Sequence, residues 1–376
     1  MRRRAVRCLG TRPTSSVQTH PEKDRPRDLD DTELYFEGCA RSGWGVGIYT
    51  SAMAAPRIGV VGATGAVGTI TLALLAERGY DVRAFASARS AGSKLPFGND
   101  EILVEEATHE ALSAGDIELF LFSIGTDASR ELVPIASAAG AICIDKSSAY
   151  RLVDGYPLVV PEVNANRAVE ALGSHRIVAN PNCCTIPLTC VLKPLHDVVP
   201  LKRVHVATYQ SVSGAGAKRM EQLRAEPSSE HNLVMDWSWE GDESDEESKL
   251  HAETRKILEL PDLAISATCV RVPVLVGHSE AIWVEFEEPL SPQDATAILR
   301  EAPSVRVLEL PAFPTPNDAE GGDEVLVGRI RADEGSVNGL ALFLSCDNLR
   351  KGAALNAIQI AEVLLAGVAT ADKRRI

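Results

Sequence analysis

Short apolar runs alternate with helical segments rich in Leu and Ala between Arg57 and Asp145. The run Ile117–Phe122 is almost wholly apolar, as expected of a parallel strand buried on both faces. The pattern predicts strands at Ile58–Val61, Val82–Ala86, Ile102–Val104, Ile117–Phe122 and Ala141–Asp145, and helices at Ile70–Glu77 and Asp127–Ala139. This alternation indicates a parallel sheet with helices on both faces.

The pattern changes in the second half of the chain. Apolar residues alternate with polar residues and one tryptophan in Ala281–Glu287, which predicts a strand with one buried face and one polar or partner-facing side. Longer strands are also predicted at Val204–Tyr209 and Ile265–Val274, and a final amphipathic helix at about Leu349–Leu365. Strands that follow one another, with helices set apart, are typical of an α+β domain with a mostly antiparallel sheet.

The first fifty or so residues fit neither pattern. Met1–Arg12 contains five arginines and no acid, and the polar stretch after it has little periodic apolar content. This composition predicts a disordered extension over residues 1–55. A targeting peptide and an over-long start are both open, and the later start at Met53 is favoured because Met53 leads straight into the first strand.

Composition narrows the class of protein. A formal net charge of −14 argues against a nucleic-acid-binding protein, which normally has a basic face. No apolar run approaches the roughly 18 residues that a membrane helix needs. The eight cysteines include no C-x-x-C pair, so neither a metal site nor a disulfide framework is indicated. We therefore expect a cytoplasmic enzyme without nucleic-acid or membrane partners.

A glycine-rich loop, Gly62–Gly68, lies directly between the first predicted strand and the first helix. In this context the pattern predicts a dinucleotide site, because glycines let the backbone approach a pyrophosphate and the helix N-terminus stabilises its charge. A plain tight turn is the alternative. The predicted cofactor contacts in the loop are Gly62, Thr64, Gly65, Ala66 and Val67.

The fold class follows from these patterns together. We predict an α/β Rossmann-type dinucleotide-binding domain with a parallel sheet over residues 56–182. Residues 183–345 are predicted to form an α+β catalytic and dimerisation domain, and residues 346–376 to return and complete the first domain.

The end of the second predicted strand indicates which cofactor binds. Sites for NAD usually place an acidic residue there, which accepts a hydrogen bond from the ribose 2′-hydroxyl. This strand instead continues into Ser87–Ser90, where Arg89 can pair with a 2′-phosphate and Ser90 can donate beside it. NADP(H) is therefore the predicted cofactor, and a plain surface arginine is the alternative.

A cysteine lies at the turn between the predicted strand Arg176–Ala179 and a helix from Thr185. Unpaired backbone N–H groups and the helix dipole favour negative charge at such a turn, which lowers a thiol pKa. Cys183 is therefore a candidate nucleophile, and with the upstream nucleotide loop it indicates an oxidoreductase that forms a thioester.

Several long motifs allow the family to be named. They are GATGAVG at Gly62–Gly68, SARSAG at Ser87–Gly92, VPEVN at Val160–Asn164, PNC at Pro181–Cys183, YQSVSGAG at Tyr209–Gly216, ETRKIL at Glu253–Leu258 and ATCVRVPVLVGHSE at Ala267–Glu280. With them the sequence resembles the aspartate-β-semialdehyde dehydrogenase family from about Arg57 nearly to the C-terminus. The resemblance implies reductive dephosphorylation of L-aspartyl-4-phosphate by NADPH, and a homodimer or a dimer of dimers.

The resemblance also implies a role for individual residues. Cys183 matches the nucleophile, His278 the acid–base group, and Gln210 the residue that orients the substrate. Arg271 and Glu247 match the residues that hold the substrate α-carboxylate and α-amino group, and Arg151 and Lys249 the phosphate binders. Asn182 is a further expected substrate contact, and Ser123, Ser213, Gly214 and Asn348 are further expected cofactor contacts.

Some positions weaken or depart from the resemblance. The stretch Glu240–Glu247 is acidic and is expected to be a solvated loop, so Lys249 and Glu247 could equally belong to an exposed charged face. Lys146 stands where Asn often follows the aspartate, which adds a cation near the expected phosphate region. Cys184 stands where Ser or Thr commonly follows the nucleophile, so it is an alternative nucleophile.

Two other functions are alternatives. An N-acetyl-γ-glutamyl-phosphate reductase has a related fold and runs the same acyl-phosphate chemistry on a longer substrate. A non-catalytic paralogue could bind nucleotide and act only as an interaction module, although such proteins tend to lose the cysteine or the histidine. Activity with each substrate distinguishes these alternatives.

Overall fold

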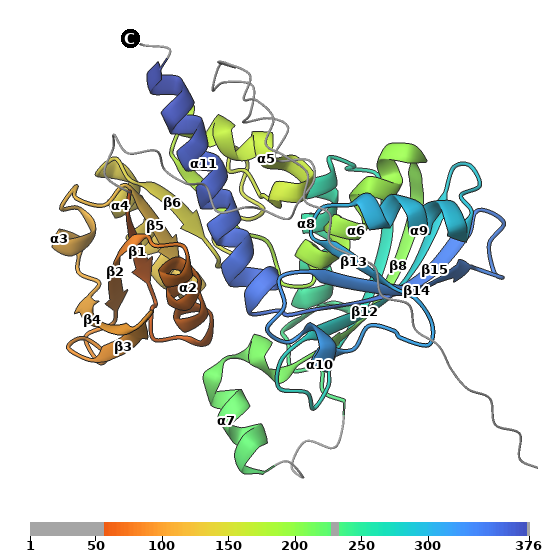
Figure 1. Ribbon diagram of the computed structural model, residues 1–376, viewed down its shortest axis with the longest axis horizontal. Coiled ribbons are helices and arrows are strands. Elements are labelled where there is room, and N and C mark those ends of the chain that lie inside the picture. Colours follow the sequence, from red (N-terminus) through yellow and green to blue (C-terminus); the bar gives the residue numbers. More distant parts are fainter. Residues whose placement is uncertain (1–55, 227–232, 374–376) are drawn as a thin grey trace, which may run out of the picture. The chain divides into compact units, whose positions relative to one another are not determined.

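The computed structural model of the protein describes residues 56–226 and 233–373. The predicted disordered extension and the start at Met53 therefore lie outside the described residues. The first sheet has seven strands in the order β3-β4-β2-β1-β5-β6-β7, all parallel except for β3 (Figure 1). Its strands are β1 (Arg57–Val61), β2 (Asp81–Ala86), β3 (Lys94–Phe97), β4 (Asp100–Glu106), β5 (Leu119–Phe122), β6 (Ile142–Asp145) and β7 (Ile177–Ala179).

The order of the parallel strands places a ligand site at one edge of this sheet. The chain runs outward from β1 through β2 to β4 and then reverses to β5, β6 and β7 on the other side. This is the order of a dinucleotide-binding sheet, whose ligands bind outside the carboxyl ends of the strands where the order reverses. The predicted Rossmann-type fold is confirmed.

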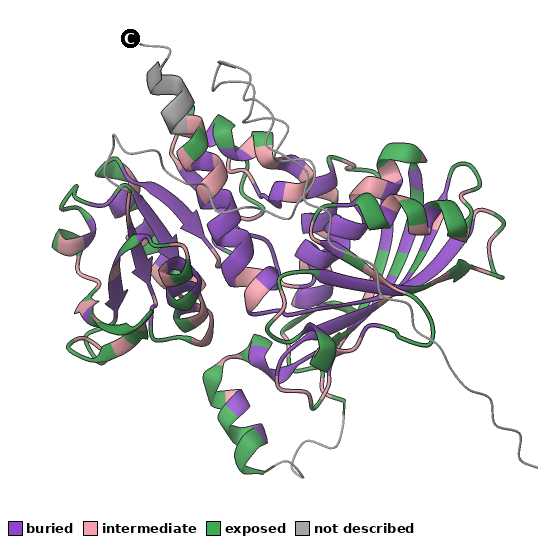
Figure 2. Ribbon diagram, in the orientation of Figure 1, coloured by how far each residue is buried: buried purple, intermediate pink, exposed green. Residues whose placement is uncertain are grey.

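Burial explains why these strands form. Every residue of β5 and β6 is buried, in keeping with sequences that are apolar except for Asp145 at the end of β6 (Figure 2). The helices of this part are α2 (Ala66–Glu77), α3 (His109–Leu112), α4 (Thr126–Ala138), α5 (Pro161–Glu170) and α11 (Leu355–Lys373). The last helix, α11, packs against α2 and α5, and its Ile358 and Leu364 join the apolar core of the first sheet.

The second sheet has six strands in the order β11-β8-β12-β15-β14-β13. The three central pairings are antiparallel and the two outer pairings are parallel, so the predicted, mostly antiparallel sheet is confirmed. Its strands are β8 (Leu201–Gln210), β11 (Ala264–Arg271), β12 (His278–Phe286), β13 (Val305–Leu308), β14 (Val325–Ala332) and β15 (Gly339–Cys346).

Helices cover one face of the second sheet. The covering helices are α6 (Thr185–Val198), α8 (Asp245–Leu258) and α9 (Pro292–Glu301). The register aligns Arg271 of β11 with Gln210 of β8, and Ser279 of β12 with Tyr209. Arg271, Gln210 and His278 therefore form a row across three neighbouring strands, and all three are buried.

Some elements were not predicted, and one expectation is wrong. The missed elements are the strands β3 and β13 to β15 and the helices α3, α5, α7 (Ala217–Ala225), α9 and α10 (Pro316–Ala319). The acidic stretch is not a solvated loop throughout: it forms β9 (Trp239–Glu240), β10 (Glu243–Ser244) and the start of α8, where Glu246 and Glu247 are buried. The domain boundaries at residues 182 and 345 stay predictions. In the described part of the chain, none of the helices has the length and apolar character to cross a membrane.

Candidate active site

A cavity of about 360 Å³ brings together most of the predicted site residues. It lies between the carboxyl edge of the first sheet and the start of α6 and α8. Its predicted lining residues are Val67, Ser123, Arg151, Asn182, Cys183, Gln210, Ser213, Gly214, Lys249, Arg271 and Asn348. Residues that were not predicted also line it, among them Trp237 and Glu246.

Cys183 lies at the N-terminal end of α6, where Cys184 is the N-cap without a side-chain capping bond. The neighbouring Cys184 side chain is the main cause that holds the pKa of Cys183 well below its usual range. The nearby His278 and Arg151 lower the pKa of Cys183 further, against burial, which raises it. Burial and the neighbouring sulfur raise the pKa of Cys184. Cys183 is therefore the thiolate of the pair.

The His278 ring meets this thiolate in a defined tautomer. Its Nε2 lies 3.2 Å from the Sγ of Cys183, and its Nδ1 accepts the backbone N–H of Ser211 at 3.0 Å. A backbone N–H can only donate, so Nδ1 carries no proton and the proton of the neutral ring is on Nε2. The ring therefore donates to the sulfur.

Asn348 contacts the residues that surround His278. Its Oδ1 accepts from the hydroxyls of Ser211 and Ser213 at 3.0 and 3.1 Å, and from the backbone N–H of Gly277 at 2.9 Å. Asn348 and Ser213 were predicted as cofactor contacts. Both line the cavity, and their cofactor contacts stay predictions; the carboxamide oxygen of Asn348 also holds Ser211, whose backbone N–H contacts the histidine.

Arg271 lies at the other end of the row and is oriented by three contacts. Its Nε donates to Asp236 at 3.0 Å, its Nη1 donates to the carbonyl of Ser211 at 2.9 Å, and its guanidinium lies 4.8 Å from the ring centre of Trp237. A Cβ at Gly214 would come within 3.3 Å of both Nη1 of Arg271 and Nε2 of His278. Glycine at position 214 thus keeps the space between the two groups open.

The prediction for Glu247 is wrong, because its two oxygens are used inside the protein. They accept the backbone N–H groups of Ser244 and Cys269, each at 2.9 Å, and the first contact belongs to the capping box of α8. The preceding residue, Glu246, lines the cavity instead. Its Oε1 accepts from Asn182 at 2.8 Å and from Gln210 at 2.9 Å.

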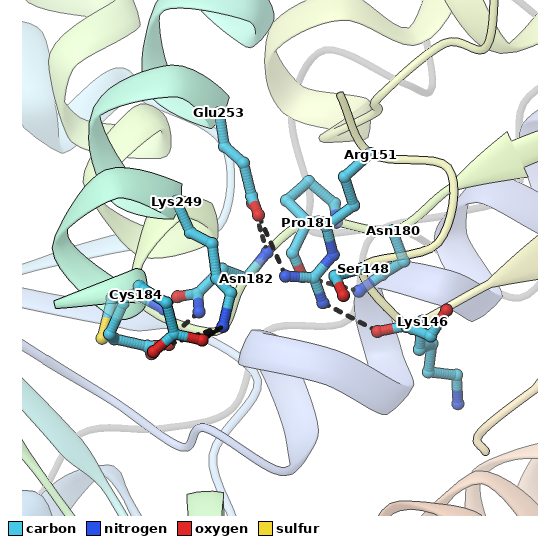
Figure 3. A network of polar contacts seen from close by, with 12 residues as sticks. Lys146, Ser148, Arg151, Asn180, Pro181, Asn182, Cys184, Lys249 and Glu253 are labelled. Atoms are coloured by element: carbon cyan, nitrogen blue, oxygen red, sulfur yellow. Dashed lines mark hydrogen bonds and ion pairs between the residues drawn. The ribbon is translucent and has the colours of Figure 1, made fainter. Parts of the chain in front are cut away.

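Arg151 and Lys249 approach one another from different elements, and Figure 3 shows their contacts. The Nη1 of Arg151 donates to Glu253 at 3.0 Å, and its Nη2 donates to the carbonyl of Lys146 at 2.7 Å. The ammonium of Lys249 donates to Asp245 at 2.8 Å. Burial is the largest influence and lowers the pKa of Lys249, but the Asp245 hydrogen bond and the charges of Glu246 and Asp245 together outweigh it, so the pKa is raised. Both side chains are therefore charged and fixed at the cavity wall.

Lys146 lines the same cavity as Arg151 and Lys249. The ammonium of Lys146 points away from Arg151 (Figure 3). It donates to the hydroxyl of Thr71, a residue of α2, at 2.9 Å. Burial lowers the pKa of Lys146 to about 7, although Asp145 opposes the shift. Only the backbone carbonyl of Lys146 contacts the guanidinium of Arg151.

The glycine loop has the geometry of a phosphate-binding turn. Gly62 has a φ of +85°, and a Cβ there would lie 2.3 Å from the carbonyl of Ser123. A Cβ on Gly68 would lie 2.2 Å from the carbonyl of Gly62, so α2 can approach β1 only with glycine at this position. Gly65, the N-cap of α2, makes no side-chain capping bond and leaves the first N–H groups of the helix available.

The other predicted cofactor contacts lie in this loop or in the turns after β5 and β2. Thr64 and Gly65 are exposed, and Ala66 begins α2. The Ser123 hydroxyl is buried and has no hydrogen-bond partner within residues 56–226 and 233–373. Arg89 is exposed and Ser90 is half-buried in the turn after β2, outside the lining of the cavity. An orphaned hydroxyl, an uncapped helix N-terminus and glycines at positions where a Cβ would clash fit a dinucleotide.

One set of side chains also has the spacing of metal ligands. The donor atoms of Cys183, Cys184 and His278 all lie within 4.8 Å of one another. The Nε2 of His278 carries the ring proton, however, because Nδ1 accepts a backbone N–H, and a protonated nitrogen cannot bind a metal ion. We assign no metal to this set.

Comparisons with known proteins agree with this site. Residues 57–171 match the family described as the NAD binding domain of semialdehyde dehydrogenase, and residues 192–351 match its dimerisation domain. The aspartate-semialdehyde dehydrogenase of Streptomyces akiyoshiensis is 44% identical over 344 residues, covering 82% of this chain and 98% of that protein. The enzyme of Aquifex aeolicus is 42% identical over 334 residues, covering 82% and 98%.

Solved structures give the same result. Aspartate semialdehyde dehydrogenase II of Vibrio cholerae, complexed with ASA, is 36% identical with a TM-score of 0.80, covering 84% of this chain and 99% of that one. The Candida albicans aspartate semialdehyde dehydrogenase with NADP is 29% identical with a TM-score of 0.68, covering 84% and 99%.

Proposed function

The chain belongs to the aspartate-semialdehyde dehydrogenase family, and from this premise we propose how its own residues carry out the reaction. The reaction is the reductive dephosphorylation of L-aspartyl-4-phosphate to L-aspartate 4-semialdehyde in the cytoplasm, as a step in the biosynthesis of the aspartate-derived amino acids. Cys183 is the nucleophile, and the low pKa of its thiol supplies the thiolate without a separate base.

The first step transfers the acyl group. The sulfur of Cys183 attacks the acyl carbon, a C–S bond forms, and the C–O bond to phosphate breaks with its electron pair leaving on phosphate. The N–H of Nε2 of His278, 3.2 Å from the sulfur, orients the thiolate before attack. No proton has to be removed from the cysteine in this step.

The second step reduces the thioester. NADPH, when bound, supplies a hydride to the acyl carbon. The tetrahedral alkoxide then expels the thiolate and leaves the aldehyde, so charge balances without an external base. His278 stabilises first the alkoxide and then the departing sulfur by donating from Nε2, which makes it an electrostatic and acid group.

Three side chains are suited to hold the amino-acid end of the substrate. Arg271, fixed by Asp236, presents the free part of its guanidinium to the α-carboxylate. Glu246 replaces Glu247 as the acceptor for the α-ammonium group, because its carboxylate faces the cavity. Gln210 orients this carboxylate and the substrate beside the cysteine.

Arg151 and Lys249 are proposed to hold the phosphoryl group. Their charges lie on the same cavity wall as Cys183, and the Nε of Arg151 is buried without a partner among residues 56–226 and 233–373. Two cations offset the charge of the acyl phosphate and of free phosphate.

NADP(H) is the proposed cofactor. The loop Gly62–Gly68 and the open N-terminus of α2 would hold its pyrophosphate. The buried Ser123 hydroxyl, which has no hydrogen-bond partner among the described residues, would contact the nicotinamide half. Arg89 and Ser90 would contact the 2′-phosphate. The Candida albicans relative was solved with NADP, which supports this choice.

A homodimer, or a dimer of dimers, would form through the open face of the second sheet. Tyr209 and Trp283 are 37% and 38% exposed on this face, and Tyr209 lies 6.2 Å from the ring of Phe343. Aromatic side chains on an uncovered strand face fit a partner surface, and the matching family is described as a dimerisation domain. Sedimentation of Trp283→Arg at low concentration should show monomers. An unchanged dimer would mean that the interface does not include this face of the second sheet.

The observation that carries the proposal is the 3.2 Å contact between a low-pKa cysteine and a donor histidine in a cavity that also holds Arg271. The test is an assay of aspartate semialdehyde oxidation with NADP and NAD side by side, with and without phosphate. We expect phosphate-dependent NADPH formation. Activity only with N-acetylglutamate semialdehyde would favour the reductase alternative, and inactivity with both would favour the non-catalytic paralogue.

A further inference from the structure

Helix α8 presents three charged side chains at the spacing of one helix face, and only one of them has a role so far. Lys249, Glu253 and Lys256 lie four and three residues apart, so they point to the same side of the helix. Lys249 belongs to the cavity wall. Glu253 is fully buried and Lys256 is half-buried, and neither lines the cavity that holds Cys183.

The ammonium of Lys256 is bound by the loop that carries Arg151. It donates to the backbone carbonyl of Arg151 at 2.8 Å, to that of Val153 at 3.2 Å and to that of Tyr156 at 2.9 Å. An ammonium group has three N–H donors, so all of them are used on this one loop. Burial lowers the pKa of Lys256, and Asp154 and Glu253 oppose the shift.

Glu253 completes the connection from the same helix face. Its Oε1 accepts from Nη1 of Arg151 at 3.0 Å, and its Oε2 accepts from the backbone N–H of Asn182 at 2.6 Å (Figure 3). The backbone of Arg151 is thus held by Lys256 and its guanidinium by Glu253. The loop comes from the first sheet, after β6, whereas α8 covers the second sheet.

We propose that Lys256 is a positioning residue for the phosphate subsite. Lys256 holds the loop that carries Arg151, so that Arg151 and Lys249 can contact the same phosphoryl group. The proposal rests on the proposed function, since it takes Arg151 and Lys249 as the phosphate binders. Without Lys256, three backbone carbonyls of the loop would lose their hydrogen-bond donor, and Arg151 could move away from Lys249. A displacement of about 1 Å at a charged contact is enough to cost roughly ten- to hundredfold in a kinetic constant.

The test compares Lys256→Met with Lys94→Met in the full-length enzyme. Methionine replaces most of the unbranched apolar stem and removes all three donors, and Lys94 is an exposed residue of β3 that pairs with Glu101. For Lys256→Met we expect the KM for phosphate in the oxidative direction to rise roughly tenfold or more, with the KM for the semialdehyde changed less than twofold. Lys94→Met should match the unmodified enzyme. An unchanged phosphate KM in Lys256→Met would overturn the proposal.

A double-mutant cycle separates positioning from general destabilisation. Because Lys256 acts through Arg151, Lys256→Met should add little to the phosphate KM of Arg151→Ala. If the full effect persists without the Arg151 guanidinium, Lys256 is only structural and the proposal is wrong. If Lys256→Met fails to fold, Lys256→Gln keeps an N–H₂ donor and should show a smaller rise of the same kind, and no rise in a folded Lys256→Gln would overturn the proposal.

Failure of the proposed function gives a different result. If Arg151→Ala itself left the phosphate KM unchanged, the phosphate site would be assigned wrongly and the inference would fall with it. If Arg151→Ala raised that KM and Lys256→Met did not, the phosphate site would stand and only the inference about Lys256 would be lost.

Discussion

The substrate side and the cofactor side of the cavity differ in how far their polar groups are already paired. On the substrate side, Arg271 contacts Asp236 at 3.0 Å, Arg151 contacts Glu253 at 3.0 Å and Lys249 contacts Asp245 at 2.8 Å. Each cation that we propose to bind substrate is held by a carboxylate of the protein. On the cofactor side, the N-terminus of α2 has no side-chain cap and the Ser123 hydroxyl has no partner in the described part of the chain.

This difference indicates two modes of binding. Groups held by the fold are placed before the substrate arrives, so they can act on the geometry of the reaction and not only on affinity. Groups without partners make their contacts only when a ligand supplies them, so they contribute mainly to affinity. Substitutions on the substrate side should therefore change kcat or the KM of a substrate, and substitutions on the cofactor side should change the dissociation constant of the nucleotide.

Removal of the nucleophile should have the largest effect. Cys183→Ser should lower turnover by roughly 10³-fold or more, because the covalent step is lost. NADPH binding, followed by nucleotide fluorescence, should stay nearly unchanged because the cofactor side is untouched. Cys184→Ser is the control and should keep most activity; a dead Cys184→Ser beside an active Cys183→Ser would exchange the roles of the two cysteines.

Arg271→Lys tests placement without loss of charge. Lysine lacks the planar fork that contacts Asp236 and the Ser211 carbonyl, so we expect kcat/KM to fall about 10²-fold in both reaction directions, with a lower kcat as well as a higher KM. The matched control is Arg306→Lys, whose arginine is 51% exposed and paired with Glu324. A change in KM alone would mean that Arg271 contributes affinity but not alignment.

Lys249→Ala should act on phosphate and little else. Loss of a charge-assisted contact of about 1.5–3 kcal/mol corresponds to a rise of roughly ten- to hundredfold in the KM for phosphate. The KM for the semialdehyde, which carries no phosphate, should change little. Steady-state kinetics in the oxidative direction measures both constants. An unchanged phosphate KM would mean that Lys249 does not bind phosphate and belongs only to a solvated charged face.

Arg89→Ala should have the smallest effect, and one confined to affinity. Arg89 is exposed, so its contact with a 2′-phosphate is partly screened, and we expect about a tenfold rise in the dissociation constant for NADP with that for NAD unchanged. Calorimetric titration with both nucleotides measures the ratio, with Arg130→Ala, at an exposed arginine of α4, as control. Equal losses for both cofactors would show that Arg89 does not contact the 2′-phosphate.

The sequence predicted the first sheet better than the second because parallel strands leave a strong local signal. The strands β5 and β6 are buried on both faces, and apart from the final Asp145 of β6 they are continuous apolar runs. The strands β13 and β14 are shorter or partly exposed, and their pairing depends on residues distant in sequence. Their apolar pattern alone does not separate them from loops.

The sequence predicted the kinds of residue that line the site, but it assigned the acidic residue to Glu247 instead of the neighbouring Glu246. Glu246 and Glu247 are adjacent, and helical geometry turns them about 100° apart, so only the start of α8 decides which one faces the cavity. The pattern Ser244-x-x-Glu247 is that of a capping box and could have assigned Glu247 to the helix start. Contacts such as Lys256 with three carbonyls have no sequence signal, because they depend on how a distant loop folds over the helix.

The central claim is that Cys183 carries the acyl group as a thioester, and one experiment tests it directly. The enzyme is mixed with NADP and aspartate semialdehyde without phosphate, so that the thioester forms and cannot be released to phosphate. We expect a rapid burst of NADPH in proportion to enzyme. Fragmentation of the acylated peptide, which contains both Cys183 and Cys184, should place the acyl mass on Cys183, and added phosphate should remove it. No burst, or an acyl group found on Cys184 instead, would contradict the account.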